Sequence, residues 1–165
     1  MKSPICEEDI QLGRLCRICE AKLKAGQISP IDFELLKAID KLENKKYLIS
    51  TEIVRAFELD GTVLVFARGN VGMLIGKAGK NVKELGEKLG KKVRIIELSD
   101  DSKETIQQIL GRARISAVNR VFKPESEELK VIVEARDRGS IEPIKGKVEE
   151  IIRKILKKPV EISFA

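Results

Sequence analysis

The sequence of 165 residues contains no histidine and no tryptophan. Without histidine, the Ser–His–Asp and Cys–His systems that activate a nucleophile are not available. Carboxylates are plentiful, but none stands out by its spacing or by apolar surroundings. We therefore predict that the chain is not an enzyme and has no small-molecule substrate.

Long apolar runs are also missing, and no segment reaches the roughly 18 consecutive apolar residues of a membrane helix. The first residues, Met1 to Asp9, include acidic side chains and lack the apolar region of a signal peptide. We predict no membrane contact and a cytoplasmic location. Aromatic residues are scarce too: Tyr47 and five phenylalanines do not suggest a surface on which bases would stack.

Positive charge is present in excess, with a formal net charge of +6 and a pI near 9.2. The excess is concentrated in residues 71–94, where the only acids are Glu84 and Glu87. The basic residues of that stretch are Lys77, Lys80, Lys83, Lys88, Lys91, Lys92 and Arg94. A local basic surface is typical of polyanion binding. It is also compatible with an ordinary solvated helix face, because lysine and glutamate are abundant throughout the chain.

Two glycines bracket a small basic loop inside this stretch. The segment reads Ile75-Gly76-Lys77-Ala78-Gly79-Lys80-Asn81-Val82. Glycine at both ends lets the main chain turn tightly and approach a phosphate. Apolar spacing predicts a helix from Asn81 to Leu89, whose first N–H groups would meet an anion. The alternative is that the two glycines merely end one helix and begin the next.

The elements around the loop follow a definite order. Strands are predicted at Ile53–Leu59 and Val63–Phe66, joined by the hairpin signal Asp60-Gly61. A short helix at Val71–Ile75 precedes the loop, and a strand within 90–96 follows the second helix. Another helix, Pro30 to Glu43, comes before the first strand, with Ser29 as its N-cap.

This order, with its GxxG loop, resembles the KH domain, and the leading helix resembles the type II arrangement. The resemblance implies a three-stranded sheet with helices packed on one face, and a loop and apolar groove that hold about four nucleotides of single-stranded RNA. RNA rather than DNA is implied by the resemblance alone. The residues that would bind RNA are Ile75, Gly76, Lys77, Ala78, Gly79, Lys80, Asn81, Val82 and Lys83.

An internal repeat predicts a second unit of the same kind. Shifting the chain by 66 positions aligns Ile75–Leu98 with Ile141–Phe164 without a gap. Upstream, a helix at 102–111 and strands at 115–122 and 129–135 repeat the order. The aligned loop is Glu142-Pro143-Ile144-Lys145, which lacks both glycines, although Gly146 could partly replace the turn. We predict an α+β chain of two tandem type II KH domains, the second degenerate and mainly structural.

Tandem units with the segment Val71–Gly76 and a lysine-rich helix resemble the archaeal relatives of the transcription factor NusA. That resemblance implies an RNA-binding factor associated with transcription elongation or termination. The alternative is a protein-interaction adaptor that docks on RNA polymerase or the ribosome and binds little RNA itself.

The three cysteines lie near the N-terminus in the pattern Cys6-x2-Asp9-x6-Cys16-x2-Cys19. A two-residue gap lets both thiolates reach one ion, and zinc also accepts a carboxylate oxygen. We therefore predict one structural zinc held by these four residues, similar to the four-cysteine zinc knuckles of some archaeal KH proteins. The alternative is that Cys19 belongs to the core, because Leu15, Cys19 and Leu23 follow helical spacing. The predicted regions are 1–44, 45–98 and 99–165.

Overall fold

The computed structural model describes all residues from 1 to 165. The chain divides into two compact units, Met1–Leu98 and Ser99–Ala165. Residues 1–44, treated above as a region of their own, belong to the first unit. None of the helices is long and apolar enough to span a membrane.

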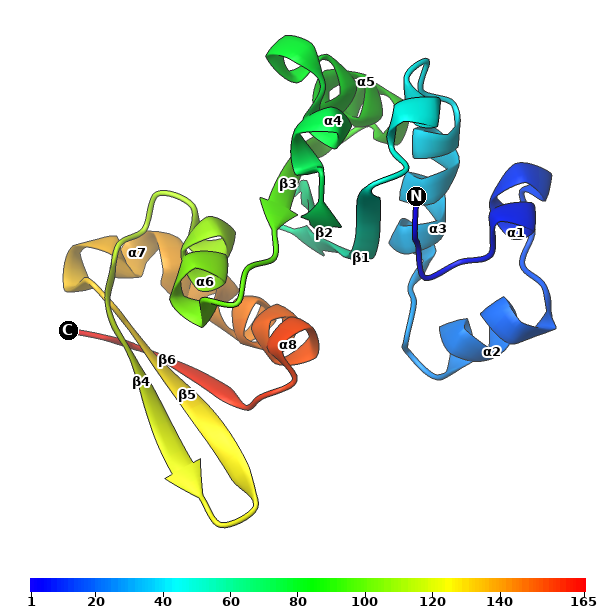
Figure 1. Ribbon diagram of the computed structural model, residues 1–165. Helices are drawn as coiled ribbons and strands as arrows, with labels where there is room; N and C mark the ends of the chain where they lie inside the picture. The colour runs from blue at the N-terminus through cyan, green and yellow to red at the C-terminus, as the bar shows by residue number, and fades with distance from the viewer. The chain divides into compact units, whose positions relative to one another are not determined.

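The first unit contains five α-helices and three strands (Figure 1). The α-helices are α1 (Glu7–Leu12), α2 (Arg17–Lys24), α3 (Pro30–Asp40), α4 (Val71–Ile75) and α5 (Lys80–Leu89). The strands are β1 (Thr51–Leu59), β2 (Thr62–Gly69) and β3 (Lys92–Glu97), and the 3-10 turns are η1 (Lys45–Tyr47) and η2 (Lys77–Gly79).

The sheet of this unit has the order β1-β2-β3, with β1 antiparallel and β3 parallel to β2. Asp60 and Gly61 form the hairpin turn with φ angles of 50° and 76°, which match the right-handed twist of the strands. The parallel partner β3 is reached through the crossover α4–η2–α5, which packs on the same sheet as α3. The GxxG loop therefore lies within the crossover.

The core of the first unit forms between the sheet and α3, α4 and α5. Leu35, Leu36 and Ile39 of α3 are fully buried, as are Leu74 of α4 and Leu85 of α5. The predicted helix begins at Pro30 as expected, but it ends at Asp40 rather than Glu43. After Asp40 the backbone continues as a tight turn with hydrogen bonds between residues three positions apart, such as Leu42 N–H to the Ile39 carbonyl at 3.0 Å. Leu42 is buried although it lies beyond the end of the helix. The apolar spacing in the sequence therefore continues past the last helical residue.

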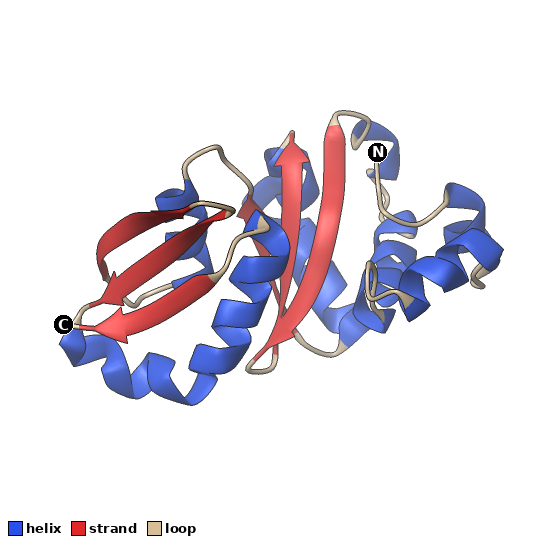
Figure 2. Cartoon of the chain, turned by 90° about the horizontal axis from the view of Figure 1, so that it is seen from below, coloured by secondary structure: helices blue, strands red, loops and turns tan.

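The second unit repeats the order of strands and main helices. Its elements are α6 (Ser102–Leu110), β4 (Ile115–Lys123), β5 (Ser126–Val133), η3 (Ala135–Asp137), α7 (Arg138–Ile141), η4 (Glu142–Ile144), α8 (Lys145–Leu156) and β6 (Val160–Phe164). The sheet order is β4-β5-β6, again antiparallel and then parallel. Figure 2 shows helices and strands as separate layers in each unit. The predicted α+β fold with two three-stranded sheets is confirmed.

One strand of the second unit differs from its prediction. β5 was expected at 129–135, but it begins at Ser126 and ends at Val133. It extends toward the hairpin because Lys123 and Ser126 still form a ladder pair there. The first residues of β5 are polar and do not alternate with apolar ones. The sequence therefore gives no sign that they belong to a strand. Ala135 instead starts η3.

Candidate nucleic-acid interface

The backbone of the GxxG loop is left-handed at three of its four residues. Gly76, Ala78 and Gly79 have φ angles of 79°, 54° and 73°. Two backbone bonds hold the loop in shape, from Gly76 N–H to the Gly72 carbonyl at 3.0 Å and from Gly79 N–H to the Gly76 carbonyl at 3.1 Å. The loop turns sharply and leads directly into α5.

The two glycines of the loop are required for different reasons. At Gly76, ψ is 168°, a region of backbone space restricted almost entirely to glycine. A Cβ at this position would lie 2.9 Å from Cγ of Asn81. Gly79 has an ordinary left-handed conformation, and a Cβ there would meet no heavy atom within 4 Å. Gly76 is therefore needed by the fold of the loop, whereas Gly79 leaves its surface open.

The N-terminus of α5 is left uncapped. Its N-cap is Gly79, which has no side chain to accept a hydrogen bond, and its first turn contains no acidic residue. The first N–H groups of a helix lack partners inside the helix and attract anions. An anion at Gly79 would meet these groups at the helix start.

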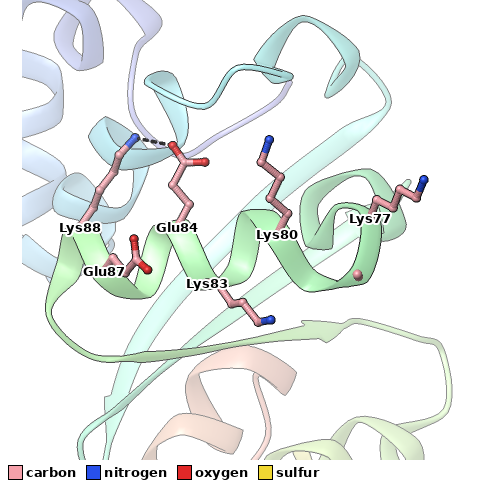
Figure 3. Close-up of a pocket in the computed structure, with 7 residues that line it drawn as sticks. Lys77, Lys80, Lys83, Glu84, Glu87 and Lys88 are labelled. Carbon is pink, nitrogen blue, oxygen red and sulfur yellow. Dashed lines mark ion pairs between the residues drawn. The ribbon is translucent and has the colours of Figure 1, made fainter.

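Lysines surround this helix start, as Figure 3 shows. A hollow of about 650 Å³ follows the outer face of α5. It is lined by Lys77, Ala78, Lys80, Lys83, Glu84, Glu87 and Lys88. Lys88 pairs with Glu84 at 3.1 Å, and exposed Lys80 is 3.5 Å from Glu43. Lys77 and Lys83 form no ion pair, so the end of the hollow beside the loop is its more positive end.

The remaining predicted RNA-binding residues occupy different environments. Ile75 is 36% exposed and Val82 is half-buried against the core, so both retain apolar surface near the loop. Asn81 is only 5% exposed and makes hydrogen bonds inside the unit. Among the nine predicted residues, Asn81 is thus the one that is buried.

The N-terminal segment brings together the four predicted metal ligands. One ligand atom each from Cys6, Asp9, Cys16 and Cys19 lies within 4.8 Å of all the others. Cys6 and Cys19 have their sulfur atoms 3.5 Å apart. Two thiolates on a tetrahedral zinc are separated by about 3.8 Å, given a Zn–S distance of about 2.3 Å. The donor set and spacing therefore fit a single such ion.

Burial and hydrogen bonds shift the pKa values of two residues in this cluster. Burial raises the pKa of the Cys19 thiol to about 12, and the hydrogen bond to Asp9 acts in the same direction. The Cys16 N–H donates to Asp9 Oδ2 at 3.0 Å and lowers the pKa of that carboxyl. A bound cation favours the thiolate over the thiol. Cys19 is also part of the hydrophobic core, so the two interpretations of the cysteine pattern are compatible.

The sequence pattern of the KH domain matches residues 34–126, more than half of the chain. The chain belongs to the KH-domain family. Two relatives are each described as a probable transcription termination protein NusA. That of Methanocaldococcus jannaschii is 39% identical over 101 residues, covering 60% of this chain and 54% of that protein. That of Methanococcus vannielii is 41% identical over 56 residues, 34% of this chain and 32% of that protein.

The predicted resemblance to archaeal NusA relatives is therefore confirmed. The chain spans about half the length of the first relative it matches, and the second alignment is shorter still. Among solved structures, the crystal structure of APE1850 aligns with a TM-score of 0.52 and 19% identity. It covers 79% of this chain and 99% of that one, and supports the fold alone.

The second unit has no left-handed loop at the positions aligned with the GxxG loop. Glu142–Ile144 forms η4 and runs directly into α8, with no residue at positive φ. Gly146, considered as a substitute for the missing turn, lies inside α8 with ordinary helical backbone. Glu142 accepts two hydrogen bonds from Arg138, at 3.0 and 3.1 Å. The expected loss of a phosphate-binding loop in this unit agrees with its backbone.

Sequence reasoning missed two residues that contact the loop region from behind. Asn44 donates to the Met73 carbonyl at 3.3 Å, and Glu43 lies beside Lys80. The sequence does not point to these two residues, because no short motif identifies a residue that contacts a loop 29 or more positions away.

Proposed function

We propose that this KH protein binds single-stranded RNA through the loop Gly76–Gly79 of its first unit. The observation that carries the proposal is the left-handed loop backbone that opens onto the uncapped N-terminus of α5. Backbone N–H groups at a helix start bind phosphate without reading the base. Lys77, Lys80 and Lys83 supply the counter-charge.

Base contacts would come from apolar surface rather than from stacking. Ile75 and Val82 flank the loop and are not fully buried. KH domains hold about four splayed nucleotides in this way, and the preference for single strands follows from that geometry. We propose further that both units are type II KH domains, since each sheet joins its last strand in parallel to the middle one. We propose a mainly structural role for the second unit.

The cellular role is proposed from the relatives. Two archaeal proteins named as probable transcription termination protein NusA align with 60% and 34% of this chain. We infer an RNA-binding factor that acts with the transcription machinery, and we expect no catalytic activity because the chain lacks histidine and offers no nucleophile with a base. The second candidate is an adaptor that docks on RNA polymerase or the ribosome.

Fluorescence anisotropy with labelled single-stranded RNA and DNA tests the main proposal. The variant Lys77→Asp with Ala78→Asp places two acids at exposed positions, and aspartate tolerates the left-handed backbone of Ala78. A matched control exists in the chain: Lys24 and Ala25 are also exposed and also precede a glycine. Lys24→Asp with Ala25→Asp makes the same change in charge away from the loop.

We expect the loop variant to lose at least about tenfold in RNA affinity, equivalent to about 1.4 kcal/mol, while the control stays within about twofold. Equal losses in both variants, with a steep dependence on salt, would leave only nonspecific attraction to a basic surface. Retention of polymerase or ribosome binding by the loop variant, without RNA binding by the wild type, would favour the adaptor.

We also propose that Cys6, Asp9, Cys16 and Cys19 hold one structural zinc. A metal bound there would stabilise the fold of the segment that contains α1 and α2. Metal analysis of the purified protein should find about one zinc per chain. Cys19→Ser should abolish that zinc, and Asp9→Cys should retain it with higher affinity. Wild-type protein that refolds with the same stability in the presence of a chelator would contradict a structural role.

A further inference from the structure

The GxxG loop is strained, and its neighbours must hold it. Ala78 has a left-handed backbone, which costs an ordinary L-residue about 1–2 kcal/mol. Gly76 is in a region that other residues almost never occupy. Such conformations persist only where surrounding contacts determine them. The two backbone hydrogen bonds of the loop join Gly79 to Gly76 and Gly76 to Gly72 of α4. Neither reaches α3, α5 or the sheet.

We propose that Asn81, supported by Asn44, is a positioning residue that holds the GxxG loop in its RNA-binding shape. This inference rests on the proposed RNA-binding function and names the part of the first unit that prepares the loop for RNA. Asn81 is the second residue of α5, and its side chain is buried rather than directed to solvent.

The amide of Asn81 joins the two sides of the loop. Its Nδ2 donates to the Met73 carbonyl of α4 at 3.1 Å, across the loop from its own position on α5. Because α4 has only five residues, its last carbonyls lie at a helix end and need partners from outside. The same side chain lies against Gly76, where a Cβ would be 3.0 Å from Nδ2. Asn81 thus fixes the end of α4, the first glycine and the start of α5 together.

A second contact anchors this amide to the linker that follows α3. Asn81 Nδ2 also donates to Asn44 Oδ1 at 2.9 Å, and Asn44 Nδ2 donates to the Met73 carbonyl at 3.3 Å. The three groups form a closed triangle of hydrogen bonds. Next to it, Glu43 faces Lys80. Residues 43–44 therefore contact residues 80–81 by a hydrogen bond and an ion pair.

The second unit provides an internal comparison. At the positions aligned with Gly76, Gly79 and Asn81 it has Glu142, Lys145 and Lys147. Its backbone there forms η4 and the first turn of α8, with no residue at positive φ. The buried asparagine occurs in the unit with the left-handed loop and is missing from the unit without it.

Two aspartate variants separate positioning from charge. Asn81→Asp removes the donor to both Met73 and Asn44. Asn44→Asp adds the same charge at the side chain that is hydrogen-bonded to Asn81. It keeps the oxygen that accepts from Asn81 and loses only the longer hydrogen bond to Met73. Gln27→Glu adds one negative charge at an exposed position in the loop between α2 and α3 and serves as the remote control.

RNA affinity is measured by anisotropy well below the melting temperature of every variant, and the amide signals of Gly76 and Gly79 are followed by NMR without RNA. We expect Asn81→Asp to weaken RNA binding about tenfold and Asn44→Asp about two- to threefold, because a less ordered loop must be organised on binding. The glycine signals should shift or broaden in Asn81→Asp and stay unchanged in Gln27→Glu.

Equal losses for Asn81→Asp and Asn44→Asp would overturn the proposal, since charge alone would explain them. So would unchanged glycine signals in Asn81→Asp. If Lys77→Asp with Ala78→Asp abolishes RNA binding while Asn81→Asp binds like the wild type, the positioning role is wrong and the proposed function stands. If the wild type binds no RNA, the proposed function fails, and the glycine signals alone decide whether Asn81 holds the loop.

Discussion

The two glycines of the GxxG loop should differ strongly in their tolerance of alanine. Gly76→Ala introduces a Cβ at 2.9 Å from Cγ and 3.1 Å from the backbone nitrogen of Asn81. Neither atom can retreat freely, because Asn81 is buried and hydrogen-bonded to Met73 and Asn44. The substitution also forces alanine into backbone space that belongs to glycine. Strain of about 1–3 kcal/mol and overpacking of about 1–3 kcal/mol predict a loss of about 2–6 kcal/mol.

Gly79→Ala should cost far less. Its φ of 73° and ψ of 19° are those of a left-handed turn, and the added Cβ would meet no heavy atom within 4 Å. Left-handed backbone destabilises alanine by about 1–2 kcal/mol. Alanine also lowers the conformational entropy of the unfolded chain, which offsets about half of that loss. We therefore expect a loss of about 1 kcal/mol. Ala78 already shows that this loop accommodates alanine at positive φ.

Urea unfolding followed by tyrosine fluorescence measures both changes. Tyr47 is the only tyrosine, there is no tryptophan, and Tyr47 lies in the first unit. The signal therefore reports on the unit that carries the loop, even if the two units unfold separately. Equal losses of free energy for Gly76→Ala and Gly79→Ala would refute the reasoning, because it depends on the contact that only Gly76 makes with Asn81.

Two further predictions concern other contacts of the first unit. Asp32 is 1% exposed and accepts hydrogen bonds from Ala56 N–H at 2.6 Å, Ser29 N–H at 2.7 Å and Arg55 Nε at 3.2 Å. Asp32→Ala leaves the Arg55 charge without its partner and should cost about 3–5 kcal/mol in the same urea assay. Glu34→Ala removes an exposed partner of Lys37 on the same helix and should cost less than about 0.5 kcal/mol; similar losses would contradict the assigned role of Asp32. Glu43→Gln frees Lys80 and should raise RNA affinity up to about twofold at low salt, with no effect at about 1 M salt, where charges are screened beyond about 3 Å. An increase that persists at high salt would show that Glu43 acts other than through charge.

Much of the fold was predictable because its signals are local. Asp60-Gly61 marks a hairpin by the backbone angles it allows, and Val71–Ile75 is bounded by a capping asparagine and a glycine. The end of α3 was not predictable from apolar spacing, since Leu42 is buried whether it lies in a helix or in the turn after it. The start of β5 was missed for the opposite reason, because its first residues pair with β4 without entering the core.

The sequence suggests which residues form the candidate sites, but it does not show how their side chains are oriented. Cysteine spacing pointed to a metal site, and the fold adds that the ligand atoms converge and that Cys19 also belongs to the core. Asn81 was grouped with the RNA-binding residues by its place next to the loop. Its inward orientation depends on Asn44 and Met73, which are distant in sequence, so no local pattern could reveal it.

The comparison between the two units also bears on why the loop exists. Both units have the same order of strands and crossover helices, yet the second one passes through this region with helical backbone and no positive φ. The crossover can therefore be completed without a left-handed loop. In the first unit the loop carries strain at Ala78, and Gly79 leaves open surface that no packing contact uses. This strain, which the architecture does not require, lies next to an uncapped helix start and to Lys77 and Lys83, and it supports the proposal that a ligand uses this backbone.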